Sequence, residues 1–81
     1  MIENISQFIV RELLNKPVEY ELSKDQELLL SGLVDSLGIM LLVNYISDEF
    51  NYEVPPQDVT IENFSTIGIL ADYLKNKNVM F

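Results

Sequence analysis

The run from Ser36 to Phe50 constrains the fold more than any other part of the sequence, because its apolar residues recur at three- and four-residue steps. That spacing lines one face of an α-helix, whereas a strand would alternate at every second residue. Asp35 stands directly before the run, where its carboxylate can accept hydrogen bonds from the first helical amides. We therefore predict a long amphipathic helix with Asp35 as its N-cap. Its expected inward face consists of Ile39, Leu42, Val43, Ile46 and Phe50.

Helical spacing also predicts a first helix from Ile2 to Leu14 and a last helix from Thr66 to about Asn76. Asn15 and Pro17 should end the first helix, because proline cannot continue the hydrogen-bond ladder. The last helix can be capped by Ser65 or Thr66. The segment 60–64 is long enough for only about one turn, capped by Thr60. The expected inward residues are Ile2, Ile5, Phe8, Ile9 and Leu13 in the first helix and Ile67, Leu70, Ala71 and Leu74 in the last.

The segment from Lys16 to Val34 is predicted to be a long ordered connection. Within it, Val18–Leu22 alternates apolar and polar residues like a strand, but the only candidate partner, Tyr52–Val54, is too short for a stable sheet. Loops of this length in small domains tend to be functional. We expect four of its apolar residues to reach the core: Val18, Leu22, Leu28 and Leu30.

These segments predict an all-α fold, a four-helix bundle with three long helices, one short helix and a long loop between the first two. The 81 residues suit a single domain over residues 1–81, with one core and no deep active-site cavity. Residues 78–81 are expected to fray, although Val79, Met80 and Phe81 are apolar enough to dock.

The composition excludes several classes of function. The chain has no cysteine and no histidine, so thiol chemistry, Ser–His activation and a nitrogen-ligated zinc site are all excluded. A net charge of −8 opposes binding to nucleic acid or anionic membranes and favours basic partner surfaces. No signal peptide or membrane-spanning run is visible, so we expect a monomeric cytoplasmic protein. No carboxylate pair has a convincing acid–base spacing, and no EF-hand ligand pattern occurs.

The segment Gly32-Leu33-Val34-Asp35-Ser36-Leu37-Gly38 places an acidic residue and a hydroxyl at the start of the strongest helix. A helix N-terminus offers unpaired amides and positive partial charge, which favour a phosphate attached at Ser36. On the pattern alone, ordinary helix capping is the simpler interpretation of Asp35 and Ser36, because Asp and Ser cap helices in most globular proteins.

The run from Gly32 to Leu37 resembles the signature of the acyl carrier protein family, in which an Asp-Ser-Leu triplet opens the second helix. The likeness extends over nearly the whole chain. Before the serine, the family's loop is similar to Leu28–Gly32 here. The end of the family's second helix is similar to Glu49-Phe50 followed by Val54-Pro55. The third helix and the start of the fourth in peptidyl carrier domains are similar to Glu62–Ile67.

The resemblance implies a carrier and not an enzyme. A phosphopantetheinyl transferase would attach the 4′-phosphopantetheine of coenzyme A to Ser36, and the thiol of the arm would hold acyl, aminoacyl or peptidyl groups as thioesters. The family's acidic residue before the serine implies a role for Asp35 in engaging the transferase. Implied further partners are an adenylating or acyl-loading enzyme and a downstream synthase, dehydrogenase or thioesterase.

The exposed side of the second helix departs from bacterial fatty-acid carriers, which commonly show several glutamates there. Here only Asp48 and Glu49 are acidic, which favours specialised metabolism, of the nonribosomal peptide or polyketide type, over primary fatty-acid synthesis. Leu37, Leu41 and Asp48 lie at four- and seven-residue steps and predict a partner-binding stripe. Asn44 and Tyr45 are expected to flank this stripe. The alternative function from another class is a cofactor-free helical interaction module with an apolar groove.

Overall fold

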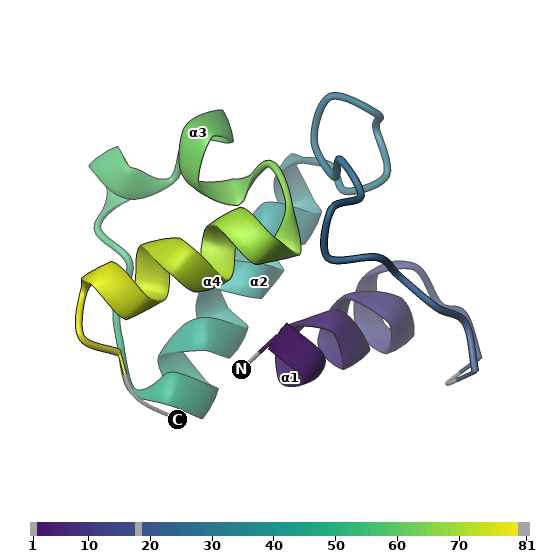
Figure 1. Cartoon of the computed structure of the whole chain (residues 1–81), viewed down its shortest axis with the longest axis horizontal. Helices are drawn as coiled ribbons and strands as arrows, with labels where there is room; N and C mark the ends of the chain where they lie inside the picture. Colours follow the sequence, from purple (N-terminus) through teal and green to yellow (C-terminus); the bar gives the residue numbers. More distant parts are fainter. Residues whose placement is uncertain (1, 18, 80–81) are drawn as a thin grey trace.

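In the computed structural model, which describes residues 2–17 and 19–79, the chain is helical and contains no strand within those ranges. The predicted all-α bundle is confirmed. In chain order the elements are α1 (Ile2–Phe8), continued by a π-helical turn η1 (Ile9–Leu13), α2 (Ser36–Phe50), the short 3₁₀ turn η2 (Pro56–Asp58), α3 (Ile61–Phe64) and α4 (Ile67–Asn76). In Figure 1, α4 passes in front of α2, α1 lies beside them, and the long loop 14–35 returns from the end of η1 to the start of α2.

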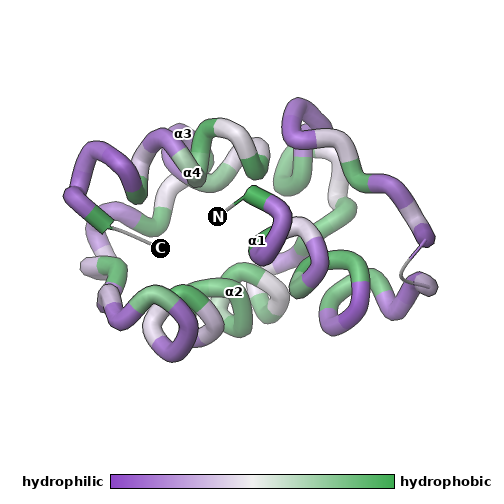
Figure 2. Tube along the Cα trace, turned by 60° about the horizontal axis from the view of Figure 1, so that its bottom comes forward, coloured by the Kyte–Doolittle hydropathy of each residue, from purple (hydrophilic) through white to green (hydrophobic). Residues whose placement is uncertain are grey.

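The core forms where the apolar faces of α1, α2 and α4 meet. Figure 2 shows hydrophobic residues recurring along these helices, as their sequence spacing predicts. The residues most completely buried come from the first helix, the loop, α2, α3 and α4: Ile5, Ile9, Leu28, Leu42, Ile46, Phe64, Ile67, Leu70 and Leu74. Val43 is only half-buried, at the margin of the predicted inner face of α2.

The first helix is not regular throughout. The amide of Leu14 donates to the carbonyl of Ile9 at 2.9 Å, five residues back, which is the hydrogen bond of a π-helix. Within this wider turn Val10 is buried as well as Ile9, which regular helical spacing did not predict. Asn15 then adopts φ 54°, a left-handed conformation that asparagine tolerates at helix ends, and the helix stops as predicted.

The loop residues 14–17 and 19–35 contact the core through a different set of side chains from the predicted one. Leu28 is buried and Leu22 half-buried as expected, and Val18 lies outside the described residues. The prediction for Leu30 is wrong, because 74% of this side chain is exposed. Val34 is buried instead, and its amide donates to the carbonyl of Leu28 at 2.8 Å, which closes the loop just before α2.

The caps of the short and last helices are threonines. Thr60 Oγ1 accepts from the Asn63 amide at 3.3 Å, and Thr66 Oγ1 accepts from the Ile69 amide at 3.1 Å. Ser65 is therefore not the cap of α4, and its carbonyl accepts the Leu28 amide at 2.8 Å instead. Beyond α4, Val79 is buried and its amide donates to the Leu74 carbonyl, so the tail docks at that point; Met80 and Phe81 lie outside the described residues.

Candidate functional site

Ser36 is the first residue of α2 and is exposed to solvent. Asp35 precedes it in an extended conformation, and its Oδ1 atom accepts a hydrogen bond from the Gly38 amide at 2.8 Å. The Asp35 carbonyl accepts the Ile39 amide at 2.9 Å, which is the first intrahelical bond. The predicted N-cap is confirmed, and it holds the first turn of α2, which contains Ser36.

The electrostatics at Ser36 favour an attached phosphate. The amides of Ser36 and Leu37 precede that of Ile39, the first amide with an intrahelical carbonyl partner, so the helix provides no carbonyl for them. The dipole of the 15-residue helix places partial positive charge at this end. A phosphodiester on Ser36 would meet both features, so the residues present fit a phosphopantetheine arm at this position.

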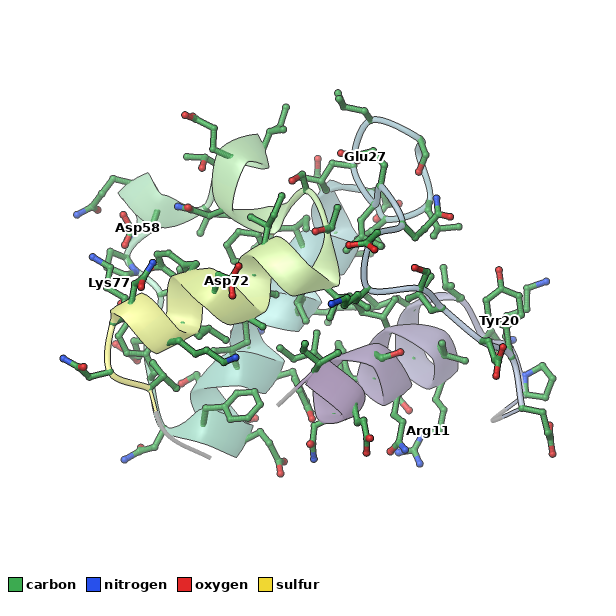
Figure 3. All side chains as sticks on the ribbon, in the orientation of Figure 1. Arg11, Tyr20, Glu27, Asp58, Asp72 and Lys77 are labelled. Carbon is green, nitrogen blue, oxygen red and sulfur yellow. The ribbon has the colours of Figure 1, made fainter. Side chains whose placement is uncertain are left out.

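The loop before Ser36 is held by a carboxylate that sequence reasoning missed. Glu27 Oε1 accepts the amides of Leu29 and Leu30 at 2.6 and 2.7 Å, and the Glu27 carbonyl accepts the Ser31 hydroxyl at 2.6 Å. Gly32 follows with φ 78°, a conformation that residues with a side chain rarely adopt. In an acidic chain, nothing in the sequence distinguishes Glu27 from a solvated glutamate. Its hydrogen bonds hold the turn in which the Leu30 side chain is exposed; Glu27 is labelled in this loop in Figure 3.

Two grooves meet at the start of α2. The larger, the α3-side groove, has a volume of about 610 Å³ and includes Ser36, Met40 and Ile61 in its lining. The smaller, the α1-side groove, has a volume of about 280 Å³ and lies between η1 and α2. Asp35 lines both grooves, so Ser36 stands at the boundary between them. The α1-side groove is lined by Glu12, Leu13, Gly32, Leu33, Val34, Asp35, Leu37, Gly38 and Leu41.

Four of the five predicted partner-binding residues are exposed in the structure, and one is half-buried. Leu37, Leu41, Asn44 and Asp48 are exposed along α2. Tyr45 is half-buried: its ring stacks on Phe8 with centroids 4.3 Å apart, and its hydroxyl donates to the Asn4 carbonyl at 3.1 Å. Burial, with the nearby Glu49 charge, raises the pKa of the Tyr45 phenol. Tyr45 therefore joins α2 to α1 inside this chain.

The predicted partner-binding residues also leave out part of the apolar surface around Ser36. Met40 is 66% exposed and lies one helical turn after Ser36, while Ile61 is 51% exposed on α3. The sequence places Met40 on the exposed side of α2, and its four-residue step from Ser36 could have added it to the predicted surface. Ile61 could not have been found this way, because only the packing of α3 beside α2 brings it to the α3-side groove.

Neither metal binding nor membrane spanning is indicated within residues 2–17 and 19–79. Those residues contain no group of three or more acidic side chains placed to hold a metal ion. None of the helices in that part of the chain is long and apolar enough to cross a bilayer.

The comparison with protein families decides between the alternatives that the sequence left open. Residues 7–74 match the model of the phosphopantetheine attachment site. The chain belongs to this family. The match includes the start of α2 and both grooves, and it favours a cofactor-bearing carrier over the cofactor-free interaction module. No curated protein and no solved structure matches the chain.

Membership of the family establishes the general function. The protein is a carrier that bears a covalent 4′-phosphopantetheine arm, and it is not itself a catalyst. A carrier of this kind works with a phosphopantetheinyl transferase, which installs the arm, and with synthetic enzymes that use it.

Proposed function

We propose that Ser36 is the attachment point of the arm, and that the protein carries acyl, aminoacyl or peptidyl thioesters between enzymes of specialised metabolism. The observation that carries the proposal is the exposed Ser36 at the capped N-terminus of α2, inside the matched family region. We also propose that residues 1–81 act as a single carrier domain in the cytoplasm.

The other hydroxyls near this end of the molecule are already engaged. Ser31 Oγ donates to the Glu27 carbonyl, and the threonines at positions 60 and 66 cap α3 and α4. The Ser36 hydroxyl makes no hydrogen bond to the part of the chain that the structure describes. It is therefore free to react without disturbing a cap or a turn.

The proposed attachment is a phosphoryl transfer onto the Ser36 oxygen. Ser36 Oγ attacks the phosphorus that bears the pantetheine in coenzyme A, forming a new P–O bond. The pyrophosphate P–O bond breaks, and adenosine 3′,5′-bisphosphate leaves with the bond's electron pair. The proton of Oγ passes to a base on the transferase, since the Asp35 carboxylate next to Ser36 is engaged by the Gly38 amide. When bound, the arm supplies a thiol that holds cargo as a thioester.

The surface of α2 supports a role in specialised metabolism over fatty-acid synthesis. The positions next to Ser36 are the exposed Leu37, Met40 and Leu41, and acidic residues appear only further along, at Asp48 and Glu49. A surface of this kind favours partners that dock by apolar contact rather than by charge alone. The partners we propose are an adenylating or acyl-loading enzyme and a downstream synthase, dehydrogenase or thioesterase of a nonribosomal peptide or polyketide system.

Intact-protein mass spectrometry tests the attachment site. The chain is incubated with coenzyme A, a divalent metal and a broad-specificity phosphopantetheinyl transferase. We expect the addition of one phosphopantetheine mass to the wild type and to Ser31→Ala, and no addition to Ser36→Ala. A wild type that stays unmodified while a control carrier is modified would contradict the carrier function. Addition that persists in Ser36→Ala would contradict only the site.

A further inference from the structure

The α1-side groove lies close to Ser36 and has features of a docking site. Its walls are leucines from three parts of the chain, η1, the loop and α2, and include Leu13, Leu33 and Leu41. The side chains of Glu12 and Asp35 also line this groove and are exposed. A groove with leucine walls and two exposed carboxylates in its lining suits a ligand that carries both an apolar and a cationic group.

Among residues 2–17 and 19–79, no ion pair involves the carboxylates of Glu12 or Asp35. The ion pair found among the described residues joins Lys77 to Asp58, far from this groove. Arg11, next to Glu12 in the sequence, interacts electrostatically with the Tyr45 phenol further along α2, and Figure 3 shows its side chain at the outer edge of the first helix. Asp35 uses one carboxylate oxygen for the Gly38 amide. The groove therefore retains negative charge in a chain whose net charge is −8.

The position of the groove identifies one partner that must contact it. It includes Asp35, Leu37 and Gly38, the residues that surround Ser36 in the first turn of α2. Enzymes that process the cargo reach the distal thiol of the arm and need not approach the Ser36 oxygen. The transferase must bring a phosphorus atom to Ser36 Oγ itself, so it has to contact this turn of the helix. It must also hold the phosphates of coenzyme A, which requires basic groups near its own active site.

From these contacts we propose that the α1-side groove is a docking site for the phosphopantetheinyl transferase, which inserts a large apolar side chain and pairs an adjacent Lys or Arg with Glu12. The proposal rests on Ser36 as the attachment point and adds to it that recognition extends from α2 onto the π-helical turn of the first helix. Glu12 is a recognition residue in this scheme, because it contacts the partner and not the reacting atoms.

Steady-state kinetics of arm attachment with matched variants tests the docking site. Glu12→Lys and Glu62→Lys each change the net charge from −8 to −6, since a lysine replaces a glutamate, and both glutamates are exposed. They lie on opposite sides of Ser36, on η1 and α3. We expect Glu12→Lys to raise the KM for the carrier by roughly tenfold with kcat little changed, and Glu62→Lys by less than about twofold.

A second pair isolates the apolar contact. Leu41 is 43% exposed beside the α1-side groove, and Ile69 is 42% exposed on α4. Leu41→Ala and Ile69→Ala therefore remove similar exposed apolar surface at different places. We expect a several-fold rise in KM for Leu41→Ala alone, on the order of what one lost apolar contact contributes.

The outcomes separate the docking site from the attachment site. Equal KM values for the two lysine variants, or for the two alanine variants, overturn the docking proposal while leaving Ser36 as the attachment point. A wild type that receives no arm contradicts the proposed function itself. Circular dichroism melts confirm that each variant is folded. If Glu12→Lys does not fold, Glu12→Gln replaces it, because this substitution removes the charge without reversing it.

Discussion

The carboxylate of Asp35 accepts the amide of Gly38 at 2.8 Å, so the residue before the candidate attachment serine also holds the first turn of its helix. One side chain thus combines a structural function with the recognition function proposed for it. A loss of activity in an Asp35 variant could arise from either. The two functions can be separated because one needs only an oxygen acceptor and the other needs the charge.

We predict that Asp35→Asn keeps the cap and that Asp35→Ala loses it. Asparagine supplies an acceptor oxygen, whereas loss of an N-cap costs about 1 kcal/mol of stability. Urea unfolding should therefore place Asp35→Asn near the wild type and Asp35→Ala about 1 kcal/mol lower. Both variants lack the charge, so both should receive the arm more slowly than the wild type. Normal rates in Asp35→Asn would show that Asp35 acts only as a cap.

Packing on the inner face of α2 gives a second prediction. Ile46 is fully buried and Phe50 is 7% exposed, so truncating either to alanine should destabilise the fold by roughly 2–5 kcal/mol. Met40, on the same helix but 66% exposed, provides the matched control, and Met40→Ala should change stability by less than about 0.5 kcal/mol. Denaturant unfolding of the three variants is the measurement. Similar losses in all three would mean that the buried face of α2 is assigned incorrectly.

The parts of the fold that the sequence predicts are those fixed by local interactions. Helical spacing identified the long helices, and Asp35 and Thr60 were predicted as caps because a cap bonds to amides only three residues away. Leu30 was misplaced because its direction depends on the Glu27 carboxylate, which accepts the Leu30 amide in the turn. Ser65 was a plausible cap, but only the tertiary structure brings its carbonyl to the Leu28 amide.

In the candidate site, too, the sequence predicts the local features but not those that depend on tertiary packing. Ser36 and Asp35 form a short contiguous motif, so the sequence alone could single them out. The grooves on either side of Ser36 combine residues from η1, the loop, α2 and α3, and no sequence spacing relates Glu12 or Ile61 to Ser36. The stacking of Tyr45 on Phe8 likewise depends on how α1 packs against α2.

At the far end of the molecule, a phenol network predicts a dependence of stability on alkaline pH. The Tyr73 hydroxyl donates to the Asp58 carboxylate at 2.5 Å and lies 3.4 Å from the Tyr52 hydroxyl. Burial and the hydrogen bond to Asp58 raise the pKa of Tyr73 above its usual value of 10.0. The folded state therefore holds this proton more tightly than the unfolded state. The resulting stability is fully present below pH 10 and is lost as the pH rises above it.

Comparison with Tyr73→Phe isolates this contribution. Phenylalanine keeps the ring but has no proton to lose, so the free energy of unfolding of this variant should fall less steeply than that of the wild type above about pH 10. At neutral pH the variant should be less stable by roughly 1–3 kcal/mol, because the Asp58 carboxylate loses its charged hydrogen bond. Urea titrations at a series of pH values provide both numbers. Parallel pH profiles for the two proteins would contradict a raised Tyr73 pKa.

The last prediction concerns the exposed leucines of α2 and the enzyme that loads the arm. Leu41 is 43% exposed, so a glutamate at this position should be tolerated by the fold, yet it would place a charge inside a mainly apolar contact. Leu41→Glu should therefore keep the melting temperature close to that of the wild type and, in protein that already carries the arm, slow thioester loading by an established cognate enzyme. Ile69→Glu, with nearly equal exposure on α4, is the control and should load normally.

The response to salt distinguishes an apolar contact from a charged one. Because the wild-type contact at Leu41 is apolar, its loading rate should change little between low and physiological ionic strength. The loss in Leu41→Glu should shrink only modestly with added salt, since burying the new charge costs free energy that screening does not restore. Circular dichroism melts and loading rates across ionic strengths measure these effects. A variant that melts early would place Leu41 in the core, and unchanged loading would show that partners contact a different surface of the carrier.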